Sequence, residues 1–145
     1  MGKLILIVDD ETDFSELLQF QLRDRQYEVL SAATGTEALD KVRRHLPDVI
    51  LMDLLLPDLD GLTLCEIIRR HHATRSTPII MISAVANDVT RHSAKIAGAS
   101  AFFSKPLDFN RLRTQLELLL TSPQSSRESQ DARALAASRV SIPKP

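Results

Sequence analysis

The chain has 145 residues and a formal net charge of -1, with 26% of its residues charged. This length allows one domain with a real core plus a short appendage, and the near-neutral charge does not indicate a nucleic-acid or membrane partner. The single cysteine, Cys65, cannot form an internal disulfide, which favours a reducing, cytoplasmic setting. The first apolar run meets acids at residues 9–11, so we expect neither a signal peptide nor a membrane anchor.

Short apolar runs alternate with stretches of helical period along the chain. The expected strands are 4–8, 28–32, 49–52, 78–82 and 101–104. Three of them are apolar at consecutive positions, as in strands buried on both faces of a parallel sheet. Of the helices expected between and after the strands, the fourth is the faintest and rests on Val89, Ala94 and Ala97. This alternation of a strand and a helix, repeated five times, predicts an α/β sheet with right-handed crossovers.

The composition changes after Thr121, where a segment rich in serine and containing Pro123 ends the last helix. Ser125 and Glu128 have the spacing of a capping box, but an isolated helix as short as the remaining segment allows would be marginal. We therefore expect a domain over residues 1–121 and a polar, disordered tail over 122–145.

Polar side chains follow the expected strands. In a sheet of this kind the ligand site lies beyond the carboxyl ends of the strands, where the strand order reverses. The residues placed there are Asp9, Asp10 and Glu11 after the first strand, Asp53 after the third, Ser83 and Ala84 after the fourth, and Lys105 and Pro106 after the fifth. Any one of these acids alone is more often a helix cap or a solvated loop residue. Their gathering on one edge favours a site.

Clustered carboxylates predict a hard divalent cation at this edge. Two unit charges about 4 Å apart repel by roughly 4 kcal/mol at an effective dielectric near 20, and oxygen-only ligands suit Mg2+ better than zinc. One carboxylate can then attack a phosphoryl group, and Asp53 is favoured because it ends the central strand. Asp9 and Asp10 form the expected metal pair. The Lys105 ammonium neutralises phosphoryl charge, and Ser83 donates a hydrogen bond.

The ordered set resembles the receiver domain of two-component response regulators. The matching words include Ile7-Val8-Asp9-Asp10-Glu11, Pro47-Asp48-Val49-Ile50-Leu51-Met52-Asp53, Leu56-Pro57 followed by Asp60-Gly61, and Ala97-Gly98-Ala99. The resemblance covers about residues 3–120 and implies a five-stranded parallel sheet with helices on both faces, the (βα)5 flavodoxin-like three-layer sandwich. It implies a response regulator that is phosphorylated on Asp53 by a sensor histidine kinase or a histidine phosphotransfer protein, and that signals by a conformational switch.

The resemblance also implies a role for each site residue. Asp10, Asp53 and the backbone carbonyl of Leu55 bind Mg2+, and Asp9 acts through metal-bound water. Ser83 is the switch hydroxyl, Ala84 contacts the phosphoryl group, Lys105 pairs with it, and the Lys105–Pro106 bond is cis. Phe102 is the switch aromatic, with Phe103 as the alternative if the register differs by one. A downstream partner or a homodimer would use the fourth helix, fifth strand and fifth helix.

Three other functions stay open at this stage. An aspartate-nucleophile phosphatase would carry a second acid at residue 55, where Leu55 stands. A nucleotide-binding module would carry a glycine-rich loop after the first strand, and a phosphate-independent receiver-like module would have lost an acid or the lysine.

Leu55 and Val85 flank the expected phosphoryl site, and their apolar side chains predict a long-lived aspartyl phosphate. His45, His71, His72 and His92 have no ligand spacing, so we expect them to be surface residues.

Overall fold

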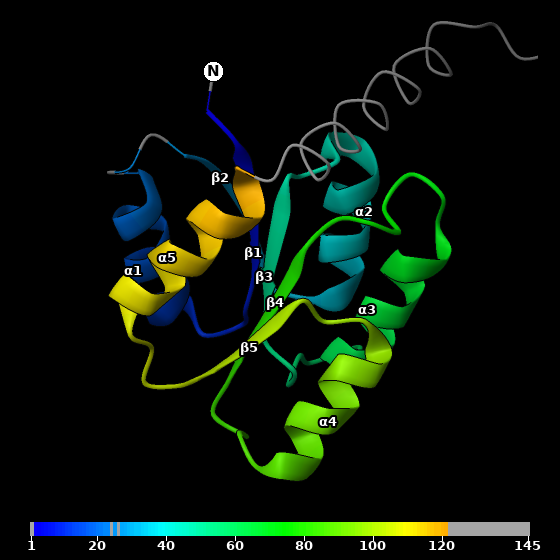
Figure 1. The fold of residues 1–145 in the computed structure, drawn as a ribbon. Helices are drawn as coiled ribbons and strands as arrows, with labels where there is room; N and C mark the ends of the chain where they lie inside the picture. Colours follow the sequence, from blue (N-terminus) through cyan, green and yellow to red (C-terminus); the bar gives the residue numbers. More distant parts are fainter. Residues whose placement is uncertain (1, 24, 26, 122–145) are drawn as a thin grey trace, which may run out of the picture.

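The computed structural model describes residues 2–23, 25 and 27–121, and the expected tail over 122–145 lies outside the described residues. Strands and helices alternate throughout the described part (Figure 1). The elements are β1 Leu4–Val8, α1 Thr12–Arg23, β2 Glu28–Ala32, α2 Gly35–His45, β3 Val49–Met52, α3 Gly61–Arg70, β4 Ile79–Ser83, α4 Asp88–Ala97, β5 Ala101–Ser104 and α5 Phe109–Leu120. The α/β class expected from the sequence is confirmed.

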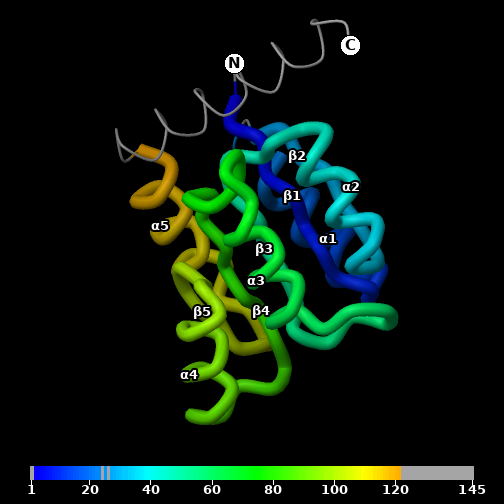
Figure 2. Tube along the Cα trace, turned by 90° about the vertical axis from the view of Figure 1, so that its right-hand side faces the viewer, coloured from blue at the N-terminus to red at the C-terminus, as the bar shows by residue number. Residues whose placement is uncertain are grey.

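The five strands form one parallel sheet in the order β2-β1-β3-β4-β5, and Figure 2 shows the strands following one another in this order across the molecule. β3 and β4 are buried at every position, which explains why their sequences are continuous apolar runs rather than alternating ones. The chain leaves β1 for β2 on one side and later crosses to β3 on the other. The strand order therefore reverses between β1 and β3, where such sheets place their ligand sites.

Two apolar layers cover the two faces of the sheet. Leu18 and Leu22 of α1 pack with Leu112 and Leu116 of α5 against one face. The helices α2, α3 and α4 supply the core of the other face, as the ribbon shows (Figure 1). Neighbouring strand residues point into opposite layers, so that Ile7 belongs to one cluster and Val8 to the other. The result is the three-layer sandwich.

Two details differ from the sequence prediction. β4 runs from Ile79 to Ser83, so it begins and ends one residue later than expected. Its end is extended because Ser83 pairs in register with Ser104 of β5. Val89, expected in the apolar stripe of the fourth helix, is 74% exposed, whereas Ala94 and Ala97 are buried. Val89 lies in the first turn of α4, and the two residues that this helix buries are both alanines.

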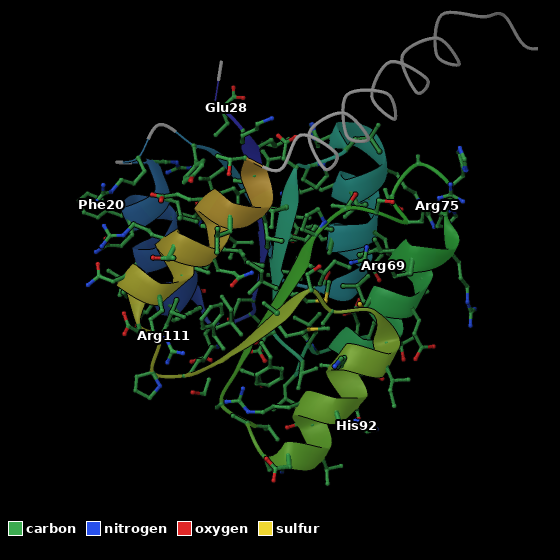
Figure 3. The ribbon with its side chains drawn as sticks, viewed as in Figure 1. Phe20, Glu28, Arg69, Arg75, His92 and Arg111 are labelled. Carbon is green, nitrogen blue, oxygen red and sulfur yellow. The ribbon has the colours of Figure 1, made fainter. Side chains whose placement is uncertain are left out.

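Arg69 ties α3 to two neighbouring segments. Its Nε donates to the carbonyl oxygen of Gly98 at 3.0 Å, and its Nη1 donates to the carbonyl oxygen of Thr77 at 2.6 Å. The carbonyl oxygen of Arg75 accepts a further bond at 3.2 Å, and Figure 3 shows Arg75 in the loop that follows α3. Gly98 has φ +111, and a Cβ there would lie 2.8 Å from the Arg69 side chain, so both backbone and space require glycine.

Cys65 is fully buried on α3, as expected for a small core residue. Its thiol donates a hydrogen bond of 3.3 Å to the carbonyl oxygen of Ala97 at the end of α4, and burial raises its pKa.

In the described residues, none of the helices is both long enough and apolar enough to cross a bilayer.

Candidate functional site

The ends of three strands place the candidate residues side by side. Val8 pairs with Met52 in register, so the residues that follow them, Asp9 and Asp53, are neighbours. The ladder continues past both strands, because the amide of Asp53 donates to the carbonyl oxygen of Val8 at 2.9 Å. The amide of Lys105 likewise donates to the carbonyl oxygen of Ser83 at 3.0 Å. Backbone hydrogen bonds therefore hold the Cα positions from which these side chains extend, independently of the side-chain contacts.

Lys105 is the centre of the site. Its Nζ lies 2.8 Å from Asp9 Oδ2, 2.6 Å from Glu11 Oε1 and 3.0 Å from Asp53 Oδ2. The side chains of Asp9 and Asp53 are 3% and 7% exposed, whereas Glu11 is 61% exposed. The ammonium also lies 4.3 Å from the centroid of the Phe14 ring, within the range of a cation–π contact. One cation thus serves three carboxylates and one aromatic face.

The pKa values of Asp9 and Lys105 are both raised. Burial raises the pKa of Asp9, although hydrogen bonds from the Lys105 side chain and the Glu11 amide act the other way. Burial alone would lower the pKa of Lys105, but its hydrogen bonds to Asp9, Glu11 and Asp53 outweigh burial, and the pKa rises. The two directions agree physically, because a shared ammonium is fully compensated while each carboxylate receives only part of its charge.

The carboxylate oxygens of Asp9, Asp10 and Asp53 lie within 4.8 Å of one another. Asp10 is exposed and faces water, whereas the other two carboxylates are buried. Oxygen donors, a surplus of negative charge beside a single ammonium, and an open side for water match the preferences of Mg2+. The residues present therefore fit this ion.

Gly61 at the start of α3 packs against the backbone that follows β3. Its amide donates to the carbonyl oxygen of Leu54 at 2.7 Å, and a Cβ at this position would lie 2.5 Å from the Asp53 carbonyl oxygen. Within the same loop, the amide of Leu55 donates to Asp53 Oδ1 at 3.1 Å. The absence of a side chain at residue 61 therefore lets α3 support the backbone on which Asp53 sits.

Ser83 and its neighbours border the site from β4. Ser83 is fully buried, and its Oγ accepts a hydrogen bond of 3.2 Å from the amide of Val85. Ala84 is exposed and Val85 is half-buried. The hydroxyl of Thr90 on α4 donates to the carbonyl oxygen of Val85 at 3.0 Å, which ties this loop to the helix.

The two phenylalanines of β5 lie on opposite faces of the sheet. Phe102 packs on the side of α3 and α4, with the guanidinium carbon of Arg91 4.9 Å from its ring centroid, and Phe103 packs on the side of α1 and α5. Phe102 is therefore the aromatic beside α4. The Lys105–Pro106 bond that follows is cis, as the resemblance implied.

Sequence reasoning missed two contacts of Lys105. Glu11 was placed at the strand end without a role, and Phe14 was given no part in the site. Both contacts join residues more than 90 positions apart. Local periodicity carries no signal for such contacts, although the run Asp-Asp-Glu places the third acid within reach of the same cation.

This sheet, with its acids and lysine gathered at one edge, is the architecture of a receiver domain. Residues 5–117 match the model of the response regulator receiver domain, and the chain belongs to this family. It is 37% identical over 118 residues to the response regulator PleD of Caulobacter vibrioides, covering 79% of this chain and 26% of PleD.

Other comparisons agree with this assignment. The chain is 33% identical over 120 residues to the alkaline phosphatase synthesis transcriptional regulatory protein PhoP of Bacillus subtilis, covering 83% of this chain and 49% of PhoP. The structure of the chemotaxis response regulator CheY4 of Vibrio cholerae superposes with a TM-score of 0.78 at 29% identity, covering 83% of this chain and all of CheY4. The chain spans about a quarter of the length of PleD and about half of the length of PhoP.

Proposed function

We propose that Asp53 accepts a phosphoryl group from a sensor histidine kinase or a histidine phosphotransfer protein, and that Mg2+ is required. The observation that carries the proposal is the Lys105 ammonium 3.0 Å from a buried Asp53 carboxylate, with the oxygens of Asp9 and Asp10 within 4.8 Å of it. A carboxylate between a cation and a further acid pair is placed to attack phosphorus while its surroundings neutralise the incoming charge.

Each residue has a separate part in this proposal. Asp10, Asp53 and the backbone carbonyl of Leu55 would hold Mg2+, with Asp9 acting through water. The ion supplies charge neutralisation on the phosphoryl oxygens. Lys105 donates a hydrogen bond to one phosphoryl oxygen, the hydroxyl of Ser83 donates to another, and Ala84 borders the group. In the present contact Ser83 Oγ accepts from the Val85 amide, so its O–H bond stays available as a donor.

The same residues give the phosphorylated state a different shape. When Ser83 moves toward the phosphoryl group, the loop between β4 and α4 moves with it, because the Val85 amide donates to Ser83 Oγ. The movement also reaches α4, because the Thr90 hydroxyl donates to the carbonyl oxygen of Val85. Phe102 lies on the α4 side of the sheet, with the guanidinium carbon of Arg91 4.9 Å from its ring centroid. We propose that Phe102 reports the change to a downstream partner, or to a second copy, on the surface formed by α4, β5 and α5.

The proposed activity is a switch in a reducing, cytoplasmic setting rather than turnover of a substrate. The chain would catalyse only its own phosphorylation and dephosphorylation. An aspartate-nucleophile phosphatase would release phosphate continuously from phosphate esters, whereas a receiver is labelled once.

The experiment is incubation with acetyl phosphate or beryllofluoride and Mg2+, for the wild type and for Asp53→Asn. Intact-mass spectrometry should show one phosphoryl group on the wild type and none on Asp53→Asn, and beryllofluoride should shift amide resonances in β4, α4 and β5. Absence of labelling would favour a phosphate-independent interaction module, and sustained phosphate release would favour the phosphatase.

We further propose that the aspartyl phosphate is long-lived. Leu55 follows Asp53 closely and is 60% exposed, and Val85 is half-buried beside Ser83. Neither side chain can orient a water molecule for attack. After removal of the donor, the phosphorylated wild type should persist for many minutes, and Leu55→Asn should lose phosphate faster. Loss from the wild type within seconds would contradict this proposal.

A further inference from the structure

The hydrogen-bonding capacity of Lys105 is already full. An ammonium group has three N–H bonds, and Asp9, Glu11 and Asp53 each accept one. If Asp53 carries a phosphoryl group, as proposed above, the new oxygens also need this donor. Each phosphoryl oxygen that Lys105 binds must then take an N–H bond from a present acceptor.

Asp53 itself carries the new group, so its place on Lys105 passes to the phosphoryl oxygens. The two other partners, Asp9 and Glu11, differ in what release would cost. Asp9 is 3% exposed, so a released Asp9 carboxylate would be left buried with less compensation. Glu11 is 61% exposed, and water can replace the ammonium at its carboxylate. Glu11 is also anchored independently of Lys105, because its amide donates to Asp9 Oδ1 at 2.8 Å. Its side chain can therefore let go without displacing the backbone of the site.

We infer that Glu11 is an exchangeable partner of Lys105, which holds the ammonium in the unphosphorylated domain and yields it to the phosphoryl group. This inference rests on the proposed function. Glu11 is a positioning residue: its contact engages the cation, and its own negative charge faces the incoming anion. Both effects act in the same direction, so Glu11 slows phosphorylation of Asp53 by small anionic donors.

The step affected is simple to write. An oxygen of the Asp53 carboxylate bonds to the phosphorus of acetyl phosphate, the bond between phosphorus and the acetyl oxygen breaks, and acetate leaves with the bonding electron pair. Negative charge gathers beside Lys105 as the donor approaches. Removing the charge of Glu11 lowers the repulsion and frees one N–H bond of the ammonium.

The test compares the wild type with Glu11→Gln and with Glu16→Gln. Glutamine at residue 11 keeps the shape of the side chain and removes the charge. Glu16 is another exposed acid, on α1, and Lys105 makes its three ion pairs elsewhere, so Glu16→Gln controls for the loss of one charge. Phosphorylation by acetyl phosphate is followed by intact mass at a Mg2+ concentration that saturates each variant, since loss of a nearby acid also weakens cation binding.

At low ionic strength Glu11→Gln should be phosphorylated about three to ten times faster than the wild type, and Glu16→Gln should stay within about twofold. The advantage of Glu11→Gln should shrink as salt is added, because salt screens an exposed charge much more than it screens buried pairs. A purely structural role for Glu11 would not produce this dependence on salt.

Two results would overturn the inference. One is a rate for Glu11→Gln at low salt that equals or falls below that of the wild type, while the wild type is labelled normally. The other is an increase that salt does not change. Failure of the wild type to be labelled on Asp53 is a different result, which would overturn the proposed function itself.

Discussion

Asp58 Oδ2 accepts a 2.6 Å hydrogen bond from the hydroxyl of Thr36, 22 residues earlier in the chain. The same carboxylate accepts bonds from the amides of Gly35 at 2.7 Å and Thr36 at 3.0 Å, in the first turn of α2. The loop that leaves Asp53 is thereby fastened to a helix N-terminus, where a negative charge is favourable. The hydrogen bonds from the Thr36 side chain and the two amides lower the pKa of Asp58 to about 2.

Asp58→Asn should lower the melting temperature at pH 7, because an amide is uncharged and a weaker acceptor for these donors. The pKa of Asp58 is 3.8 in an ordinary setting and about 2 in the fold, so its contribution is present above pH 4 and is lost as the pH falls toward 2. The difference between the two melting curves should therefore shrink over this range. Asp40→Asn, which breaks only an exposed pair with Arg44, is the control. Equal melting temperatures of Asp58→Asn and wild type at pH 7 would contradict the prediction.

Gly61→Ala should destabilise the domain by about 1–3 kcal/mol. The new Cβ would lie 2.5 Å from the Asp53 carbonyl oxygen and 2.8 Å from Leu54 Cα, and neither backbone atom can move freely. A loss of stability here would be informative, because replacing glycine with alanine within a helix usually stabilises the fold by roughly 0.5–1 kcal/mol. Urea denaturation measures the change, and a gain in stability would show that the loop can relax.

Arg69→Ala should lower the free energy of unfolding by about 2–4 kcal/mol, because the carbonyl oxygens of Gly98 and Thr77 lose a charged donor. Its neighbour Arg70 supplies a matched control. Arg70 is 78% exposed and pairs with Glu66 at 3.9 Å, so Arg70→Ala should cost at most about 0.5 kcal/mol. Similar urea midpoints for the two variants would show that water satisfies those carbonyl groups without Arg69.

Mg2+ should raise the melting temperature of the wild type, since the acidic cluster exists only in the folded chain. At a concentration ten times the dissociation constant the gain is about 1.4 kcal/mol. Asp10→Asn should lose most of this gain, and excess chelator should reverse it in the wild type. Sodium chloride at matched ionic strength separates binding from screening. A gain of equal size in sodium chloride would argue against a site.

Much of the fold and site was predictable because the signals are local. Continuous apolar runs marked β1, β3 and β4, and the residues after them marked the edge where Asp9 and Asp53 meet. What escaped prediction depends on contacts between distant segments. Ser83 joined β4 because β5 supplies a pairing partner. Val89 fits the helical period, but α4 turns a different side to the sheet, and no local pattern fixes that rotation.

The contacts of the charged loops were the hardest to predict. Lys105 could be assigned to the site by its position after a strand, but the choice of Glu11 as a third partner depends on how the loop after β1 closes over the lysine. The contact of Asp58 with Thr36 likewise requires the loop after β3 to lie against α2. Such choices follow from the assembled fold, since each exposed acid has equally good partners in water.

The buried thiol of Cys65 can report how often the domain opens locally. It is the one cysteine in the chain, and it is sealed between α3 and the end of α4. A thiol reagent can reach it only when this seam opens, so the labelling rate measures the opening equilibrium directly. Because α4 belongs to the surface expected to respond to phosphorylation, a change in that rate on adding beryllofluoride would follow the switch without any engineered probe. Because Cys65 is buried, a cysteine added at the surface could be labelled with a dye while Cys65 stays unlabelled.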